Sequence, residues 1–470
     1  MAAEHANPDD IRALFSRAMS AMYRDEVPAY GTLMELVRDV NADVLATAPD
    51  ERARLEALGE LERIDEERHG AIRLGTAREL FTMRRLFAVM GMHPVGYYDL
   101  SVAGVPVHST AFRPLDEASL RRNPFRVFTS LLRLDLVADA ELRAAAAEVL
   151  EAREIYTPGC LALIDRAEAD GGLSQADAER FVAEALETFR WHAEANVPHD
   201  LYRRLHDAHR LIADVVAFKG PHINHLTPRT LDIDRVQEMM PGRGITPKAV
   251  VEGPPTRSVP ILLRQTSFKA LEEPVSFPAS ASVSAADGDA QATTGRHTAR
   301  FGEIEQRGIA LTPAGQALYD RLLAETRSRI TPAADGSNAD AYRATLAEVF
   351  SAFPDDLETL RKDGLGYFRY SATGKPCADP SRGVDALVAQ GCLRADPIVY
   401  EDFLPVSAAG IFQSNLGDGA AQAFAANPNR ARFEEDLGAP VHDLFRRYAE
   451  TEARSLAEAR IALNPAPQTA

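Results

Sequence analysis

Three short segments hold side chains whose types and spacing could do chemistry, and the first of them is ERHGAIRLGT. Its His69 and Arg73 stand four residues apart. Because side chains alternate along a strand, His69, Ala71 and Arg73 would share one face, with room for a ligand over the small residue between them. On a helix, the i,i+4 spacing would also place the histidine and the arginine on one side. A capping histidine and a surface arginine in a salt bridge are the simpler alternative.

The second segment, PHINHLTPRT, carries His222 and His225. Their odd spacing points them to opposite faces of a strand, so the two cannot easily serve one metal. One of them could be a ligand while the other is structural. A single histidine at the end of a strand is more often satisfied by hydrogen bonds than by a metal.

The third segment, RFGEIEQRGIAL, places Phe301, Glu303 and Glu305 on one face of a strand. A solvated acidic face is the default interpretation of this pattern. The opposite face of the same strand, however, has the composition of a poor buried face. If the acidic face is internal instead, a metal or an arginine must accompany it, because an uncompensated buried pair of carboxylates is costly.

Two histidines and one carboxylate form a three-ligand facial set that leaves open positions on a metal. Such a set suits non-haem Fe(II) acting with oxygen and a 2-oxo acid. Zinc or manganese used as a Lewis acid is the alternative. No HxH, HExxH or CxxC motif reinforces the assignment.

The elements that must position these residues follow a repeated order of strand, helix and antiparallel strands. In the first instance we expect a strand at 69–74, a helix at 77–92 and a hairpin of two strands at 95–101 and 105–113. In the second we expect a strand at 220–227, a helix at 232–240, and strands at 250–254, 259–271 and 298–312. Helices are expected at 8–60, almost throughout 115–218 and mainly after 313, with a flexible surface loop at 278–297 and an irregular stretch at 400–415.

Composition narrows the class of protein. The 470 residues are 46% hydrophobic and 26% charged, which is ordinary for globular domains, and the formal net charge is -17. A surface this acidic disfavours nucleic acid and anionic membranes as partners. No apolar run approaches the length of a membrane helix, and nothing in the sequence indicates secretion. The three cysteines are too scattered for a disulfide framework or a zinc knuckle. We therefore expect a soluble, cytoplasmic protein.

Several blocks of sequence are similar to the 2-oxoadipate dioxygenase/decarboxylase family: HGAIRLGT, FAVMGMHPVGYYDLS, HSTAFRP, HINHLTPRTLDID, FKALEEPV, RFGEIEQRGIALT and FLPVSAAGIFQSNL. The blocks are spread over nearly the whole chain. The resemblance implies an α+β fold like that of the vicinal oxygen chelate superfamily, in which paired βαβββ modules form a curved sheet around a metal. The expected ranges are an N-terminal helical segment at 1–60, a first module at 61–114, a helical insertion at 115–218, a second module at 219–312 and a mainly helical C-terminal region at 313–470.

The resemblance places the iron ligands on His69, His225 and one glutamate of FGEIEQRG. The distantly similar hydroxyphenylpyruvate dioxygenases have an F-x-E-[VI]-x-Q-R strand whose glutamate binds iron, and this pattern, laid over 301–307, favours Glu303. Glu305 then becomes a neighbour on the same face that binds through water or pairs with an arginine. His222 has no ligand role in the resemblance.

The substrate arginine of the family corresponds to Arg73, and its substrate-contacting backbone near the C-terminus corresponds to Val406 and Ser407. The implied activity is the Fe(2+)-dependent conversion of 2-oxoadipate and O2 to (R)-2-hydroxyglutarate and CO2, by oxidative decarboxylation followed by intramolecular hydroxylation, in lysine catabolism. The guanidinium fork of Arg73 can hold the second carboxylate of this substrate with two hydrogen bonds.

Two other functions fit the same residues. One is a glyoxalase-like lyase or isomerase that acts on a small 2-oxo or hydroxy acid, with Zn, Ni or Mn as the metal and Glu305 as the general base. The other is a carboxylate-binding protein that has kept the fold without turnover. Oxygen consumption distinguishes the dioxygenase from both.

Overall fold

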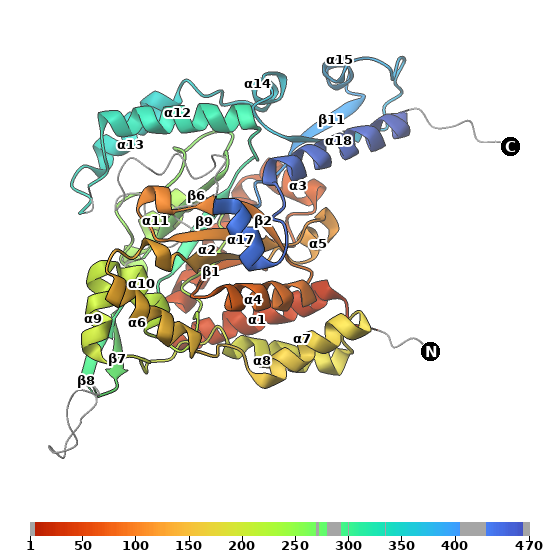
Figure 1. Ribbon diagram of the computed structural model, residues 1–470. Helices are drawn as coiled ribbons and strands as arrows, with labels where there is room; N and C mark the ends of the chain where they lie inside the picture. Colours follow the sequence, from red (N-terminus) through yellow and green to blue (C-terminus); the bar gives the residue numbers. More distant parts are fainter. Residues whose placement is uncertain are drawn as a thin grey trace, which may run out of the picture. The chain divides into compact units, whose positions relative to one another are not determined.

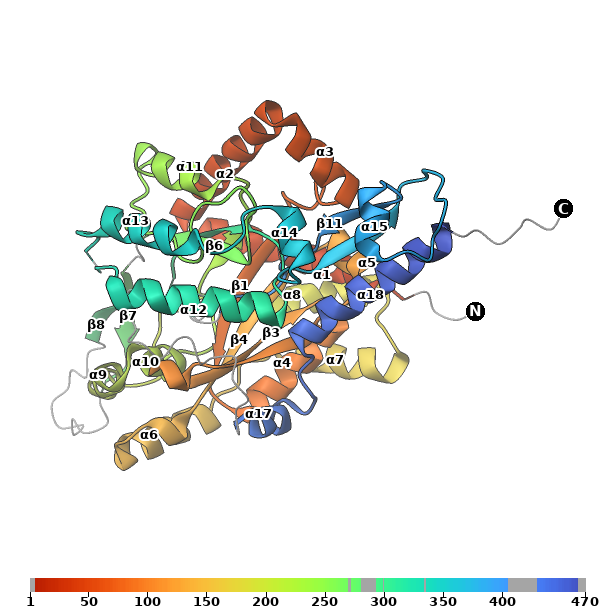
Figure 2. The ribbon, with the colours of Figure 1, turned by 90° about the horizontal axis from the view of Figure 1, so that it is seen from above.

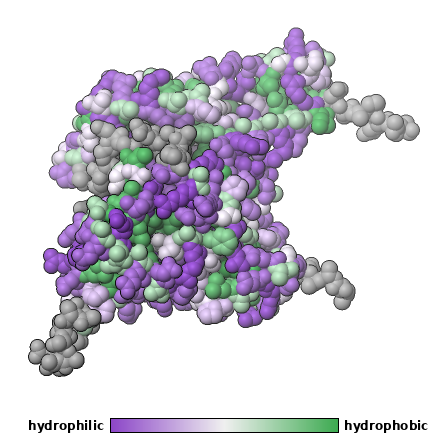
Figure 3. Space-filling view, in the orientation of Figure 1, coloured by the Kyte–Doolittle hydropathy of each residue, from purple (hydrophilic) through white to green (hydrophobic). Residues whose placement is uncertain are grey.

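The computed structural model describes residues 5–268, 272–279, 293–298, 300–333, 335–404 and 429–463. The chain forms two compact units, each assembled from separated segments. Unit 1 comprises Met1–Lys248, Gln265–Glu305 and Pro405–His442, and unit 2 comprises Ala249–Arg264, Gln306–Leu404 and Asp443–Ala470. No helix among the described residues is both long and apolar enough to cross a membrane. Hydrophilic side chains predominate on the face shown in Figure 3.

Unit 1 is organised around a five-stranded mixed sheet with the strand order β2-β3-β4-β1-β5. Strands β1 and β4 are parallel, and the other neighbours are antiparallel. Figure 2 shows β1, β4 and β3 side by side. The bounds are β1 Arg68–Leu74, β2 His93–Asp99, β3 Val107–Arg113, β4 Arg126–Leu132 and β5 Leu226–Pro228. With helix α4, the first four strands follow one another along the chain in the order β1-α4-β2-β3-β4.

The expected order of strand, helix, strand, strand over 69–113 is confirmed. Strand β4, however, lies inside the stretch 115–218, where the sequence predicts almost only helices. Every residue of β4 is buried. A strand that is buried on both faces shows no alternation of polar and apolar residues, so its sequence does not indicate a strand. In addition, β4 stands between segments of strong helix formers.

The two faces of this sheet differ in character. Helix α4 (Ala77–Val89) packs on the first face, where the ring of Phe87 lies 4.8 Å from that of Phe112 on β3. Phe87 and Phe15 of α1 both contact Phe189, so this face carries an aromatic core. Because side chains alternate, His69 and its same-face neighbours on β1 point to the opposite face.

The second expected module is realised only in part. The structure has β5, helix α11 (Ile233–Met239), and strands β6 (Leu263–Ser267) and β9 (Glu303–Arg307), which pair with each other. The strand expected at 220–227 is confined to β5, because the amides before it bond alternately to the carbonyls of Phe189 and Ala71 rather than to one ladder. No strand forms at 250–254, where Pro254 and the proline after it lack amide donors.

A hairpin that the sequence did not predict lies between β6 and β9. Strands β7 (Glu273–Phe277) and β8 (Thr293–His297) pair antiparallel (Figure 1). The end of the expected flexible loop at 278–297 is therefore a strand. Its Thr, Gly and Arg residues are mostly exposed, which explains why composition favoured a loop.

Helices make up most of the rest of unit 1, as expected for 8–60 and for much of 115–218. Most begin at a residue whose side chain accepts a hydrogen bond from the first turn, such as Asn7 before α1 and Ser174 before α8. Their bounds are α1 Pro8–Glu26, α2 Pro28–Thr47, α3 Pro49–Leu58, α5 Glu117–Arg122, α6 Ala140–Glu151, α7 Pro158–Asp170, α8 Gln175–Glu187, α9 His199–Ala208, α10 Arg210–Val216 and α17 Asn429–Leu437.

Unit 2 is mainly helical, as the sequence predicts for the region after 313, and also contains the hairpin β10-β11. Helix α18 packs on β10, where Glu452 accepts from the amide of Phe368 and Ser455 accepts from the amide of Tyr370. Its bounds are α12 Pro313–Arg329, α13 Ala339–Phe350, α14 Leu357–Lys362, β10 Phe368–Ala372, α15 Val384–Ala389, β11 Leu393–Pro397 and α18 Leu444–Leu463. Of the irregular stretch expected at 400–415, only 400–404 are described.

A buried arginine joins α1 to the loops around the sheet. The guanidinium of Arg12 is fully buried and donates to the carbonyls of Met90, Ser119 and Asn123 at 2.8–2.9 Å. It also pairs with Asp9. Burial lowers the pKa of Arg12, and Asp9 opposes this effect. One side chain thus satisfies three carbonyls from separate parts of the chain.

We expect Arg12→Met to lower the free energy of unfolding of unit 1 by about 3 kcal/mol or more, because it leaves buried carbonyls without their donor at about 1–3 kcal/mol each. Trp191, the single tryptophan, lies in unit 1 and reports its unfolding in urea by fluorescence. Arg17→Met on the exposed side of the same helix is the control. Equal denaturation midpoints for the two variants would contradict the prediction.

Candidate metal centre

Three buried side chains converge on one point in unit 1. The ligand atoms of His69, His225 and Glu303 all lie within 4.8 Å of one another. Oε2 of Glu303 is 3.4 Å from Nε2 of His69 and 3.4 Å from Nε2 of His225. All three side chains are 0% exposed. The structure therefore brings together the three residues that the resemblance indicated as ligands.

Close backbone approach makes the two histidines neighbours. His69 is the second residue of β1, and His225 immediately precedes β5, which pairs with β1. A Cβ on Gly70 would lie 2.5 Å from the Cδ1 atom of Ile223 and 3.0 Å from the carbonyl oxygen of His225. Glycine therefore favours this close approach, since a Cβ would force Ile223 to move and would crowd the carbonyl oxygen of His225.

Glu303 is also positioned by the close approach of a glycine to a neighbouring segment. Glu303 begins β9, and the preceding Gly302 packs against Phe268, which follows β6. A Cβ on Gly302 would lie 1.9 Å from a ring carbon of Phe268. Oε2 of Glu303 accepts hydrogen bonds from Thr227 of β5 at 3.1 Å and from Gln265 of β6 at 3.3 Å. These two donors fix the carboxylate toward the histidines.

The second glutamate has a different position from the first. Oε2 of Glu305 lies 3.1 Å from Nδ1 of His69, on the far side of the ring from Glu303. Nε2 of the same ring faces Glu303, whose carboxylate also lies beside His225. Nε2 therefore points to the position that the three side chains share, and Nδ1 is placed to donate to the carboxylate of Glu305. Metal-binding histidines commonly donate their other ring nitrogen to a carboxylate in this way. The geometry therefore favours Glu303 as the ligand and gives Glu305 the task of orienting His69.

Burial of so many titratable groups shifts their pKa values. Burial raises the pKa of Glu303, against the effect of His69. Burial also acts to lower the pKa of His69, but Glu305 and Glu303 outweigh it and the net shift is upward. For His225, burial and the neighbouring His69 both lower the pKa well below its ordinary value. His225 is thus neutral at pH 7, as a metal ligand must be.

The residues present fit a divalent transition metal. Both ring nitrogens of His225 and Oε1 of Glu303 are buried and make no hydrogen bond with any described residue. Buried polar atoms without partners are rare and costly, so these atoms call for a ligand. A set of two imidazoles and one carboxylate suits Fe(II), and also zinc or manganese.

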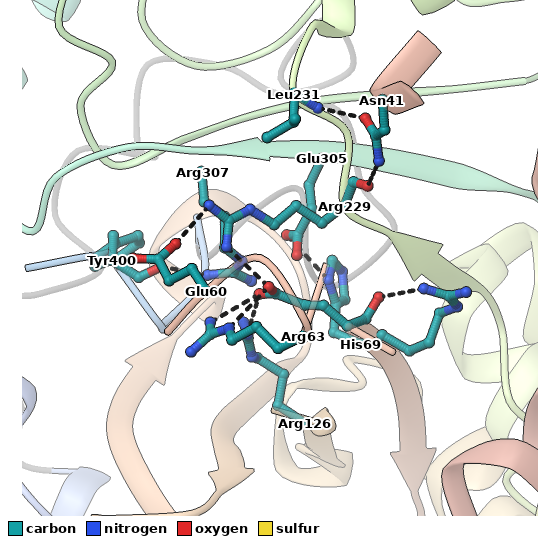
Figure 4. A network of polar contacts seen from close by, with 12 residues as sticks. Asn41, Glu60, Arg63, His69, Arg126, Arg229, Leu231, Glu305, Arg307 and Tyr400 are labelled. Carbon is teal, nitrogen blue, oxygen red and sulfur yellow. Dashed lines mark hydrogen bonds and ion pairs between the residues drawn. The ribbon is translucent and has the colours of Figure 1, made fainter. Parts of the chain in front are cut away.

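Beside this centre lies a network of buried charges, shown in Figure 4 with His69 and Glu305. The carboxylate of Glu67 pairs with Arg63, Arg126 and Arg229, and Arg229 also pairs with Glu60. Arg126 is in register with His69 on the adjacent parallel strand. The network ties the segment after α3 to β4 and β5 and so supports the strands that carry the centre.

The chain is similar to known proteins over nearly its full length. A model of the 2-oxoadipate dioxygenase/decarboxylase family matches residues 15–415. The chain belongs to this family. It is 58% identical over 466 residues to the 2-oxoadipate dioxygenase/decarboxylase of Pseudomonas putida, covering 98% of each chain, and 56% identical over 452 residues to that of Escherichia coli, covering 95% of this chain and 97% of the other. The crystal structure of the hydroxyglutarate synthase of Pseudomonas putida in complex with 2-oxoadipate matches with a TM-score of 0.87 at 56% identity, over 98% of this chain and 99% of that one.

Within this family member, Arg73 lies at the other end of β1 from His69, on the same face. The residue in register with it on β4 is Ser130, and the next in the row is Ser109 on β3. The two serine hydroxyls are buried and 2.8 Å apart. Arg73 itself pairs with Asp214 at 2.5 Å. Val406 and Ser407 lie outside the described residues.

Several of these residues were missed by the sequence analysis. Ser130 could be found only by predicting β4. Thr227 alternates with His225 and follows from the strand pattern once β5 is known. Asp214 and Gln265 carry no local signal, because their role depends on segments far away in the sequence. His222, for which the resemblance implies no ligand role, lies 3.4 Å from Asp214 rather than with His69, His225 and Glu303.

We expect substitutions of the two glutamates to have different effects on metal affinity. The affinity is measured by titration calorimetry, in which the metal is added to protein prepared without it. Glu303→Ala removes a donor atom and should abolish binding at this centre. Glu305→Gln removes only the charge that orients His69 and should weaken binding about 10- to 100-fold. The reverse order of effects would assign the ligand role to Glu305.

Proposed function

We propose that this protein converts 2-oxoadipate and O2 to (R)-2-hydroxyglutarate and CO2. In this reaction the C1 carboxylate leaves as CO2, one oxygen atom enters the new carboxylate, and the other becomes the hydroxyl group on the adjacent carbon. The observation that carries the proposal is the buried group of His69, His225 and Glu303, in a chain that matches a 2-oxoadipate dioxygenase/decarboxylase over nearly its full length.

His69, His225 and Glu303 are proposed to hold Fe(2+). When bound, ferrous iron supplies the electrons that activate O2 and the open positions for a 2-oxo acid. We further propose that the segments 61–114 and 219–312, together with β4, form two modules of the vicinal oxygen chelate type. The order β1-α4-β2-β3-β4 and the bridge between Arg229 and Glu305 support this arrangement.

The residues of the chain have separate tasks in this proposal. Glu305 keeps the proton of His69 on Nδ1, so that Nε2 stays a donor atom. Complete burial of the centre excludes bulk water, which protects reactive species from side reactions. Arg73 binds the distal carboxylate of the substrate through a charge-assisted pair, and the backbone of Val406 and Ser407 contacts the substrate, as in the family.

An oxygen-electrode experiment tests the proposed function. The protein is loaded anaerobically with Fe(II) and mixed with 2-oxoadipate in oxygenated buffer, and 2-hydroxyglutarate is assayed. We expect one O2 consumed for each 2-hydroxyglutarate formed in the wild type, and none in His225→Ala or Glu303→Ala. Loss of 2-oxoadipate without oxygen uptake and without 2-hydroxyglutarate formation would indicate a lyase or isomerase instead.

We expect Arg73→Lys to reduce kcat/KM for 2-oxoadipate roughly 10- to 100-fold. Lysine keeps the charge but loses the guanidinium fork, and a hydrogen bond to a charged group contributes about 1.5–3 kcal/mol. Activity with 2-oxohexanoate, which has a methyl group in place of the distal carboxylate, should change much less. Equal losses for both substrates would show that Arg73 does not bind that carboxylate.

A further inference from the structure

A chain of buried polar side chains, apart from the metal centre, ends at Arg73. Asp214 of α10 accepts from Nη1 of Arg73 at 2.5 Å through Oδ2. Its Oδ1 atom lies 2.9 Å from Nε2 of His297 on β8. Nδ1 of His297 in turn lies 2.9 Å from the hydroxyl of Tyr202 on α9. Four separate elements therefore meet through these contacts.

The direction of each hydrogen bond follows from the carboxylate. An ionised carboxylate only accepts, so His297 donates from Nε2 to Asp214, and its Nδ1 lies on the hydroxyl of Tyr202. His222 also contacts the carboxylate of Asp214, since its Nε2 atom is 3.4 Å from Oδ1. Trp191 packs edge-on against His222 at 4.6 Å. Both oxygens of Asp214 are thus held in fixed directions.

The carboxylate at the centre of this chain is ionised. Asp214 is only 6% exposed, and burial alone would raise its pKa. Arg73, His222 and His297 outweigh burial, so the pKa lies well below its ordinary value. A buried charge with this many partners has one arrangement, because any other leaves polar groups without partners.

We propose that Asp214 is the positioning residue for Arg73 and fixes the guanidinium in the orientation that binds the distal carboxylate of the 2-oxo dicarboxylic acid. This inference rests on the proposed function, in which Arg73 binds that carboxylate. A guanidinium carries five N–H donors in a rigid plane, so pairing with Asp214 and binding a substrate carboxylate do not exclude each other. Asp214 holds Nη1, which restricts the direction of the rest of the plane.

The inference gives a function to parts of the chain outside the metal centre. Helices α9 and α10 supply Tyr202 and Asp214, and the hairpin β7-β8 supplies His297. None of these side chains contributes a metal ligand. They act on the substrate only through Arg73, and so determine selectivity for a second carboxylate rather than the redox chemistry.

The experiment is a double-mutant cycle on the iron-loaded enzyme, with 2-oxoadipate and 2-oxohexanoate as substrates. We expect Asp214→Asn and Asp214→Ala each to raise KM for 2-oxoadipate about tenfold or more, with kcat nearly unchanged and 2-oxohexanoate turnover within about twofold of wild type. In the Arg73→Lys background the same substitutions should add little further loss, because they act through the missing fork. Tyr202→Phe should shift KM in the same direction by a smaller factor.

Asp99→Asn is the matched control. Asp99 is also a buried carboxylate of unit 1, in register with His108 on the face of the sheet away from Arg73. We expect the Asp99→Asn substitution to leave KM for 2-oxoadipate unchanged. The thermal midpoints of all variants distinguish loss of folding from loss of selectivity, and Asp214→Asn preserves the side-chain volume if Asp214→Ala does not fold.

The outcomes separate this inference from the proposed function. If the wild type does not convert 2-oxoadipate, both are overturned. If the wild type and Arg73→Lys behave as expected but folded Asp214 variants keep the wild-type KM, or bind 2-oxoadipate more tightly, only the inference on Asp214 is overturned. A full additive loss in the double variant would also overturn it, since Asp214 would then act independently of Arg73.

Discussion

The site depends on burying two carboxylates that stand two residues apart on one strand. Glu303 and Glu305 are both 0% exposed, and a buried pair of like charges is stable only with positive charge beside it. His69 lies between them and presents one ring nitrogen to each. Nε2 faces Glu303, which also lies beside His225, and Nδ1 faces Glu305. In the proposed function, this arrangement makes Glu303 a metal ligand and Glu305 the residue that orients His69.

Local pattern was enough to predict the elements that carry the centre. The short run HGAIRL, followed at once by Gly75, predicted β1, and the pattern of FGEIEQR predicted β9. These strands bring His69 and Glu303 together. Pattern failed at β4, because a strand that is buried on both faces shows no alternation. That failure concealed Ser130, which becomes visible only when β4 is placed beside β1 in register with Arg73.

The choice between Glu303 and Glu305 shows a different limit. Both residues lie on the same face of β9, so neither spacing nor burial distinguishes them. The distinction comes from which nitrogen of His69 each carboxylate meets, and this depends on the pairing of β9 with β6 and on the close approach of Gly302 to Phe268. Asp214 and His297 were beyond sequence reasoning for the same reason, because their partners come from segments far apart in the chain.

His69 and Arg73 lie on one strand. In the proposed function, this placement determines how the site distinguishes substrates of different chain length. A strand rises about 3.3 Å per residue, so the two Cα atoms are about 13 Å apart along β1. The rigid strand therefore fixes the distance between the metal end and the arginine end of the site. An arginine side chain that is free to change rotamer would make that distance variable. Selectivity for chain length would then be weak, because one methylene group more or less changes the binding free energy by only about 1–3 kcal/mol. In the proposal, Asp214 holds the guanidinium of Arg73 through a hydrogen bond. Both ends of the site would then lie at a fixed distance from each other, which is what discrimination by chain length requires.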